Sequence, residues 1–143
     1  MIQLVDIDAG NWRTALQVRE DQKQYVASAP VLLARAYAYR HFNSRAFYVC
    51  CDGEIVGMGL YYDCPDEQAY DLSQLFIDAR FQGRGYGREA TRLCLNEMRA
   101  AGRYSKVILC YVEGNEAARR MYEQFGFVVT DRDEDEIVME MQL

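Results

Sequence analysis

The order of apolar and polar residues along the chain predicts a sheet interleaved with helices. Runs typical of strands, either alternating or continuously apolar, occupy residues 2–5, 46–51, 54–62, 69–77, 106–111, 127–130 and 137–141. Apolar residues recur at helical spacing over 12–20, weakly over 21–29, and again over 31–42, 87–101 and 115–125. The predicted order is β-α-α-β-β-β-α-β-α-β-β, an α/β (α+β mixed sheet) fold in a single domain over residues 1–143.

Glycines mark how these elements connect. Asp52-Gly53 between two strand-like runs predicts a type I′ hairpin, which needs positive φ at both central residues. Gly57 and Gly59 weaken a strand interior and indicate a bulge or a close backbone approach. The order strand, helix, strand from residue 69 to 111 predicts that the two strands run parallel.

Charge narrows the classes of partner. The chain has 16 Lys and Arg against 22 Asp and Glu, a net charge of −6. Nonspecific nucleic-acid binding requires clustered positive charge, so no nucleic-acid partner is expected, whereas a cationic small molecule suits an acidic surface. No apolar run approaches the roughly 18 residues that span a bilayer. Residues 1–10 also lack the basic and apolar parts of a signal peptide. We therefore expect a cytoplasmic protein without a membrane partner.

The cysteines and the single histidine do not predict a metal site. Five cysteines occur without C-x-x-C spacing, and His41 is the only histidine. This pattern favours reduced thiols over a disulfide framework or a zinc site.

A glycine-rich loop carries the clearest chemical signal. It follows the apolar run that ends at Ile77 and opens a helix, and it reads Gln82-Gly83-Arg84-Gly85-Tyr86-Gly87. Glycines allow close backbone approach, and the first turn of a helix offers unpaired N–H groups, which together suit a phosphate. An ordinary left-handed turn before a helix would show the same glycines. A P-loop would need Gly-Lys followed by Ser or Thr, and a Rossmann loop would need G-x-G-x-x-G; neither occurs here.

Two motifs in order resemble a known family. Gln82-x-x-Gly85-x-Gly87 is followed by Asn115-x-x-Ala118-x-x-x-Tyr122, and then by Phe125-Gly126-Phe127. This sequence resembles the GCN5-related N-acetyltransferases (GNAT), and the predicted element order is similar to theirs over the whole chain. Residues 76–85 with residues 24–28 are more specifically similar to bacterial spermine/spermidine-type acetyltransferases. The resemblance implies acetyl-CoA as cosubstrate and direct transfer of an acetyl group to a primary amine in a ternary complex, with a polyamine or other small cationic amine as acceptor.

The resemblance also implies roles for individual residues. The loop backbone, with charge from Arg84 and Arg88, would hold the pyrophosphate, although solvated loop arginines would look the same. The pantetheine arm would pair with Phe76 and Ile77, and the N–H of Ile77 would face the reacting carbonyl. Residues expected to bind the cofactor are Phe76, Ile77, Gln82, Gly83, Arg84, Gly85, Tyr86, Gly87, Arg88, Asn115 and Ala118.

Two residues are candidates for proton transfer. Tyr122 would protonate the leaving thiolate, although a Tyr on an apolar helical stripe is usually a core residue. Asp71, eleven residues before Gln82, matches the base of some members of the family, but a solvated carboxylate explains it equally well. Asn115 is also a natural helix N-cap.

Other functions remain open at this stage. A module that binds acetyl-CoA without catalysis would keep the loop and lack the base, and a nucleotide-binding domain could use the same glycines. A protein N-terminal or lysine acetyltransferase would share both motifs. Members of the family often dimerise, so the resemblance leaves a homodimer open without fixing the oligomeric state.

Overall fold

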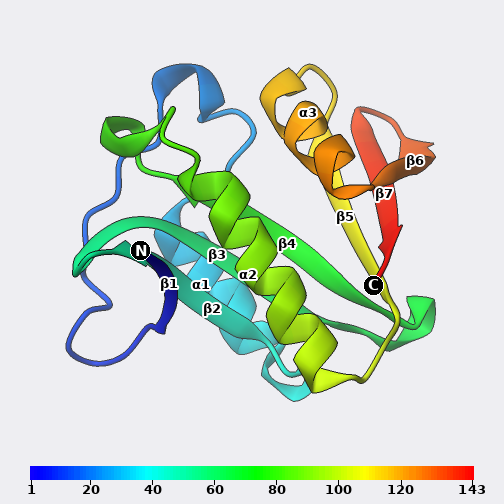
Figure 1. The fold of residues 1–143 in the computed structure, drawn as a ribbon, viewed down its shortest axis with the longest axis horizontal. Helices are drawn as coiled ribbons and strands as arrows, with labels where there is room; N and C mark the ends of the chain where they lie inside the picture. Colours follow the sequence, from blue (N-terminus) through cyan, green and yellow to red (C-terminus); the bar gives the residue numbers. More distant parts are fainter.

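The computed structural model describes residues 1–143 and places seven strands in one mixed sheet, in the order β1-β2-β3-β4-β5-β7-β6 (Figure 1). All neighbouring strands are antiparallel except β4 and β5, which run parallel as predicted. The strands are β1 Ile2–Asp6, β2 Arg45–Cys51, β3 Glu54–Cys64, β4 Ala69–Ile77, β5 Lys106–Val112, β6 Val128–Asp133 and β7 Glu136–Gln142.

Three α-helices cover the two faces of the sheet. They are α1 Ala29–Ala38, α2 Tyr86–Ala101 and α3 Glu116–Phe125. In Figure 1, α2 lies in front of the sheet and α1 behind it. The core is correspondingly divided into two clusters, one containing residues of α2 and α3 and a smaller one around Leu32 of α1. None of the helices has both the length and the apolar character needed to cross a membrane. The predicted mixed α/β fold is confirmed.

One predicted element is wrong. The helix expected over residues 12–20 is absent, because residues 9–13 form turns and residues 14–19 have no regular secondary structure. A single 3₁₀ turn follows at Glu20–Gln22. The helical contribution before β2 is therefore α1, which begins one residue before Pro30, and the short 3₁₀ turn Arg40–Phe42.

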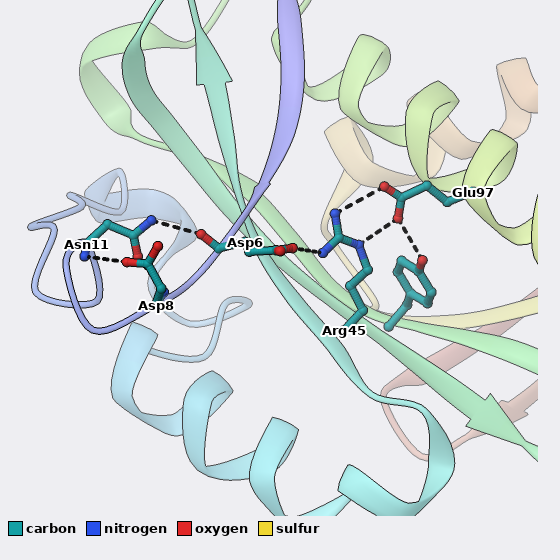
Figure 2. A network of polar contacts seen from close by, with 6 residues as sticks. Asp6, Asp8, Asn11, Arg45 and Glu97 are labelled. Atoms are coloured by element: carbon teal, nitrogen blue, oxygen red, sulfur yellow. Dashed lines mark hydrogen bonds and ion pairs between the residues drawn. The ribbon is translucent and has the colours of Figure 1, made fainter.

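Hydrogen bonds explain why the helical pattern fails there. The side chain of Asp8 accepts the backbone N–H groups of Gly10 at 2.8 Å and Asn11 at 3.0 Å, which fixes a tight turn (Figure 2). Further along, the N–H of Gln17 donates to the side chain of Asp78 at 2.8 Å. Backbone N–H groups of this segment thus donate both to the nearby Asp8 and to the distant Asp78, and these hydrogen bonds override the helical pattern.

The glycines of β3 are needed for close packing, as expected. A Cβ atom on Gly57 would lie 2.5 Å from the carbonyl oxygen of Phe76, and one on Gly59 would lie 2.3 Å from the ring of Phe47. The hairpin at Asp52-Gly53 has φ of 49° and 87°, which confirms the type I′ turn.

A polar network fastens α2 to the sheet. Arg45 of β2 donates to Glu97 of α2 at 2.7 Å and to Asp6 of β1 at 2.6 Å (Figure 2). The hydroxyl of Tyr61 donates to the same Glu97 at 2.7 Å. Because burial and the bond to Glu97 both raise the pKa of Tyr61, this phenol stays protonated. The network fixes the direction of α2, whose first turn forms part of the candidate site.

Candidate active site

The two parallel strands separate soon after they meet. Only two residue pairs join β4 to β5, Tyr70 with Val107 and Asp71 with Ile108. Beyond Asp71, β4 continues to Ile77 while it pairs with β3 alone. The edge of β4 that faces β5 is therefore open from residue 72 onward.

A cavity of about 360 Å³ lies at this opening. Residues from several separate parts of the chain line it. They are Val18, Arg19, Gln22 and Val26 before α1; Leu75, Phe76 and Ile77 at the end of β4; and Phe81, Gln82, Gly83, Gly85, Tyr86, Gly87, Arg88, Asn115, Ala117, Ala118, Met121 and Tyr122 from the loop, α2 and α3.

The structure brings most of the predicted residues together at this cavity. Every residue expected to bind the cofactor lines it except Arg84, whose guanidinium lies over the ring of Phe81, 5.6 Å from the ring centre. Of the two residues expected to transfer protons, Tyr122 lines the cavity and Asp71 does not. No group of three or more His, Cys, Asp or Glu side chains that could hold a metal ion occurs in the structure.

The glycine-rich loop presents free backbone donors to the cavity. Gly83 and Gly85 have φ of 78° and 81°, a conformation that other residues rarely adopt, and Cβ atoms there would meet no atom within 4 Å. α2 has no side-chain cap, and its first cap bond runs from Glu89 to the carbonyl of Gly85. The N–H groups of residues 82–88 therefore donate to no backbone carbonyl, and together they form an anion-binding surface.

The direction of the β4 backbone corrects one expectation. The carbonyl of Phe76 lies against Gly57 of β3, and the N–H of Asp78 donates to Val56 of β3 at 2.8 Å. Since backbone groups alternate along a strand, those of Leu75 and Ile77 face the open edge. The backbone groups of Leu75 and Ile77, and not those of Phe76, are thus directed toward the open edge, and Phe76 contributes to the cavity only as a lining residue. The sequence signal for this backbone direction was the pair Gly57 and Gly59, because the carbonyl groups of β4 that face β3 lie against these two glycines.

Part of that open edge is already occupied. The side-chain amide of Gln82 donates to the carbonyl oxygen of Ile77 at 3.0 Å. This bond joins the loop to the end of β4 and leaves the N–H of Ile77 and both backbone groups of Leu75 facing β5.

Tyr122 is buried at the wall of the cavity. Its side chain is 8% exposed and packs edge-on against Phe127, with ring centres 5.6 Å apart. Burial raises the pKa of Tyr122 well above that of a free phenol, so its hydroxyl carries a proton throughout the physiological pH range. It is both a core residue and a residue of the cavity wall.

Asn115 has the N-cap role that the sequence predicted. Its side-chain oxygen accepts the N–H of Ala118 at 3.4 Å, at the start of α3. Because Asn115 also lines the cavity, capping the helix and contacting a ligand are compatible roles.

Asp71 lies where β4 and β5 separate, near Arg35 of α1. Burial raises the pKa of this carboxyl to about 6, and the positive charge of Arg35 opposes the rise. Arg35 itself donates to the hydroxyl of Ser73 at 2.9 Å. The carboxylate therefore changes its charge close to neutral pH, as a general base must, but it does not belong to the cavity lining.

Half of the lining residues that sequence reasoning missed come from the segment before α1, and the others are Leu75, Phe81, Ala117 and Met121. Val18, Arg19, Gln22 and Val26 line the cavity, whereas Glu20 and its neighbour Asp21 do not. Sequence periodicity assigned most of this segment to a helix whose end, at Glu20 and Asp21, was a candidate for lining an acceptor pocket, so the lining role of Val18, Arg19, Gln22 and Val26 was missed.

Together the fold and the cavity define a site for an extended ligand with a phosphate group, because an open strand edge lies beside a loop with free N–H groups. The family model described as "Acetyltransferase (GNAT) family" matches residues 9–127, and the chain belongs to this family of acetyl-CoA-dependent N-acetyltransferases. The match covers the irregular segment, β4, the glycine loop and α3.

Named relatives agree with this assignment. The chain is 28% identical over 121 residues to the spermine/spermidine N(1)-acetyltransferase of Bacillus subtilis, which covers 78% of this chain and 76% of that protein. Among solved structures, it resembles spermidine N-acetyltransferase from Vibrio cholerae in complex with CoA and spermine, with a TM-score of 0.74, 19% identity, and coverage of 99% and 94%. It also resembles the ribosomal-protein-S18-alanine N-acetyltransferase from Escherichia coli, with a TM-score of 0.76, 17% identity and the same coverage. The two structural likenesses show the fold.

Proposed function

We propose that this acetyltransferase moves the acetyl group of acetyl-CoA to a small cationic amine, with a polyamine as the preferred acceptor. The observation that carries the proposal is the cavity at the open edge of β4. It joins a row of free loop N–H groups, an open strand edge and a protonated tyrosine. The similarity to a spermine/spermidine acetyltransferase over most of both chains supports the choice of acceptor.

The glycine loop would hold the pyrophosphate of CoA. All residues from 82 to 88 except Arg84 line the cavity, and the N-terminus of α2 adds a partial positive charge there. Arg88 also lines the cavity and would add a full charge. Arg84 stacks on Phe81, and this contact would stiffen the loop without bringing Arg84 to the phosphate.

The open edge of β4 would hold the pantetheine arm and the thioester. The N–H and carbonyl of Leu75 and the N–H of Ile77 are the backbone groups available there. Buried backbone groups require partners, and pantetheine amides would supply them. One of the two N–H groups would donate to the thioester carbonyl oxygen and stabilise the negative charge that develops on it.

Proton transfer completes the reaction. Asp71, with its pKa near 6, would accept the proton of the acceptor ammonium, directly or through a water molecule. The neutral nitrogen then attacks the carbonyl carbon, the carbon–sulfur bond breaks, and the second proton of the attacking nitrogen passes to solvent as the amide forms. Tyr122 would donate its proton to the departing thiolate and regain one from solvent, because a phenol with a raised pKa is fully protonated beforehand.

The surroundings of Asp71 suit a cationic acceptor. Tyr62 is its direct partner on β3, and Tyr39 stacks on Tyr62 with ring centres 4.1 Å apart. Aromatic faces next to a carboxylate attract alkylammonium groups. Tyr39 is partly exposed, so an amine could reach this group from solvent.

A thiol-release assay with an amine panel tests the proposal. Acetyl-CoA is supplied with spermine, spermidine, free amino acids, aminoglycosides and peptides that carry free N-termini, and the products are identified by mass spectrometry. We expect CoA release with acetylated spermine or spermidine at the highest kcat/KM. Preference for peptides would replace the polyamine with a protein acceptor. Tight CoA binding with no transfer to any amine would favour a sensor module.

A further inference from the structure

A strap crosses the mouth of the cavity. The strap consists of residues 17–27, whose one regular element is the 3₁₀ turn Glu20–Gln22, and four of its residues line the cavity. On one side it bonds to the end of β4. On the other side the hydroxyl of Tyr25 lies so close to Gly114, in the loop after β5, that a Cβ on this glycine would be 3.1 Å from it. The strap thus reaches across both of the separating strands.

The first tie of the strap is made by Asp78. Its carboxylate accepts the N–H of Gln17 at 2.8 Å, and the carbonyl of Gln17 in turn accepts the N–H of Ala79 at 2.7 Å. Both backbone groups of Gln17 are therefore hydrogen-bonded to residues 78 and 79, and we call this pair of bonds the clamp.

The same carboxylate also organises the start of the glycine loop. It accepts the backbone N–H of Arg80 at 2.9 Å and two guanidinium N–H groups of Arg80 at 3.0 and 3.1 Å. Asp78 therefore connects the strap with the chain that leads into the phosphate-binding loop.

The environment of Asp78 shows that its charge is held by these donors. Its side chain has no exposed surface. Burial alone would raise the pKa of this carboxyl, but the bonds from Arg80 and from the N–H of Gln17 outweigh burial and lower the pKa. A buried carboxylate so well supplied with donors keeps a fixed geometry.

Weaker ties continue along the strap. Arg19 donates to the side chain of Gln82 at 3.4 Å, and the N–H of Ala27 donates to the side chain of Gln74 of β4 at 3.2 Å. Because these later contacts are long, the clamp at Gln17 is the tie that fixes the strap.

We propose that Asp78 is a positioning residue that holds the strap over the cavity and in register with the glycine loop. The inference rests on the proposed function for its kinetic consequences. Asp78 touches neither the acceptor nor the reacting atoms; it acts through Gln17 and Arg80. Losing it would open the cavity at the strap and weaken both CoA binding and acceptor binding, while the groups that transfer protons stay in place.

Two pairs of variants test this from both ends of the clamp. Asp78→Asn removes the charge, and Asp63→Asn is its matched control, because Asp63 is 5% exposed and is held by Arg103 at 2.9 Å on a part of the fold that does not line the cavity. Gln17→Pro removes the N–H that donates to Asp78 and also fixes φ at this exposed position. Gln17→Ala keeps that N–H and controls for the side chain.

Three readouts separate positioning from general stability. They are the affinity for CoA by calorimetry, the KM and kcat for the amine, and the rate of trypsin cleavage after Arg19 and Lys23 in the strap. For Asp78→Asn and Gln17→Pro we expect about tenfold weaker CoA binding, a similar rise in KM and faster cleavage, since a hydrogen bond to a charged group is worth about this factor. We expect kcat to change less than about threefold.

The controls Asp63→Asn and Gln17→Ala should keep the wild-type CoA affinity, kinetic constants and cleavage rate, even where they are less stable. If Asp78→Asn and Gln17→Pro match the wild type in CoA affinity, KM and cleavage, or if Asp63→Asn changes them equally, the proposal is overturned. Should Asp78→Asn fail to fold, the Gln17 pair decides. A wild type that acetylates no amine would defeat the proposed function, yet CoA affinity and cleavage would still decide the role of Asp78.

Discussion

The side-chain amide of Gln82 donates to the carbonyl oxygen of Ile77 across 3.0 Å. This bond joins the first residue of the glycine loop to the last residue of β4. The phosphate-binding surface and the open strand edge are therefore held in one fixed relation, which a ligand as long as CoA requires in order to contact both.

Replacing Gln82 should loosen this relation. Gln82→Ala removes a bond worth about 1 kcal/mol, so we expect CoA affinity to fall about fivefold. Gln82→Glu should be worse, because a carboxylate cannot donate to the carbonyl and repels phosphate. Calorimetric titration with CoA measures both. Equal affinities for Gln82→Glu and the wild type would contradict the proposed position of the pyrophosphate.

Gly85 should matter more for binding than for folding. Gly85→Ala places a side chain at φ 81°, at a cost of about 1–2 kcal/mol in stability. The control is Gly53→Ala in the β2–β3 hairpin, where φ is 87° and no atom lies within 4 Å of the added Cβ. Both variants should lose similar thermal stability, but only Gly85→Ala should lose CoA affinity. A similar loss of affinity in both would show that the effect is global.

Tyr122→Phe isolates the proton donor. We expect kcat to fall about a hundredfold with an unchanged KM, since the phenol acts only when the thiolate leaves. Stability should hold, because no hydrogen bond of this hydroxyl is lost and the ring contact with Phe127 remains. Tyr104→Phe, a partly buried tyrosine outside the cavity, serves as control and should keep full activity. A kcat above one third of the wild-type value in Tyr122→Phe would remove the tyrosine from the mechanism.

Asp71 gives the activity a dependence on pH. The carboxylate must be ionised to accept a proton, so kcat should rise with pH through about 6 and then level off. Asp71→Asn should be much slower and should lack this rise. The same pH profile in both proteins would assign the rise to another group.

The stability of the Asp71 variant provides an independent check. The folded-state pKa of about 6 lies above the unfolded value, so the folded protein binds more protons between about pH 4 and 6. The wild type therefore loses stability as pH rises through this window. Asp71→Asn should be the more stable protein at pH 7, and the difference should vanish below pH 4. Denaturant unfolding at several pH values measures this, and a less stable Asn variant at pH 7 would contradict the burial of this charge.

Apolar pattern and glycine positions predicted most of the architecture. The strand 69–77 agrees with the structure residue for residue, and Gly126 ends α3 in the left-handed conformation. Both features could be predicted because each is determined by residues that are neighbours in the sequence and by a clear periodicity of apolar positions. The sequence could also predict the glycine loop, because its chemistry lies within six consecutive residues.

What the sequence could not predict depends on contacts between distant residues. The segment before α1 has a helical pattern, but the bond from Gln17 to Asp78 spans 61 positions and holds the segment as a strap. Similarly, the register between β3 and β4 decides that the backbone groups of Leu75, and not those of Phe76, face the open edge. Neither is encoded in a local pattern.

Hydrogen exchange of the protein with and without CoA tests the central claim most directly, because the account names the N–H groups that CoA engages. We expect protection to appear at residues 82–88 and at Leu75 and Ile77, and exchange in β1 and β6 at the far edges of the sheet to stay unchanged. Protection confined to other parts of the chain, or CoA binding without protection of the glycine loop, would contradict the assignment of this cavity to acetyl-CoA.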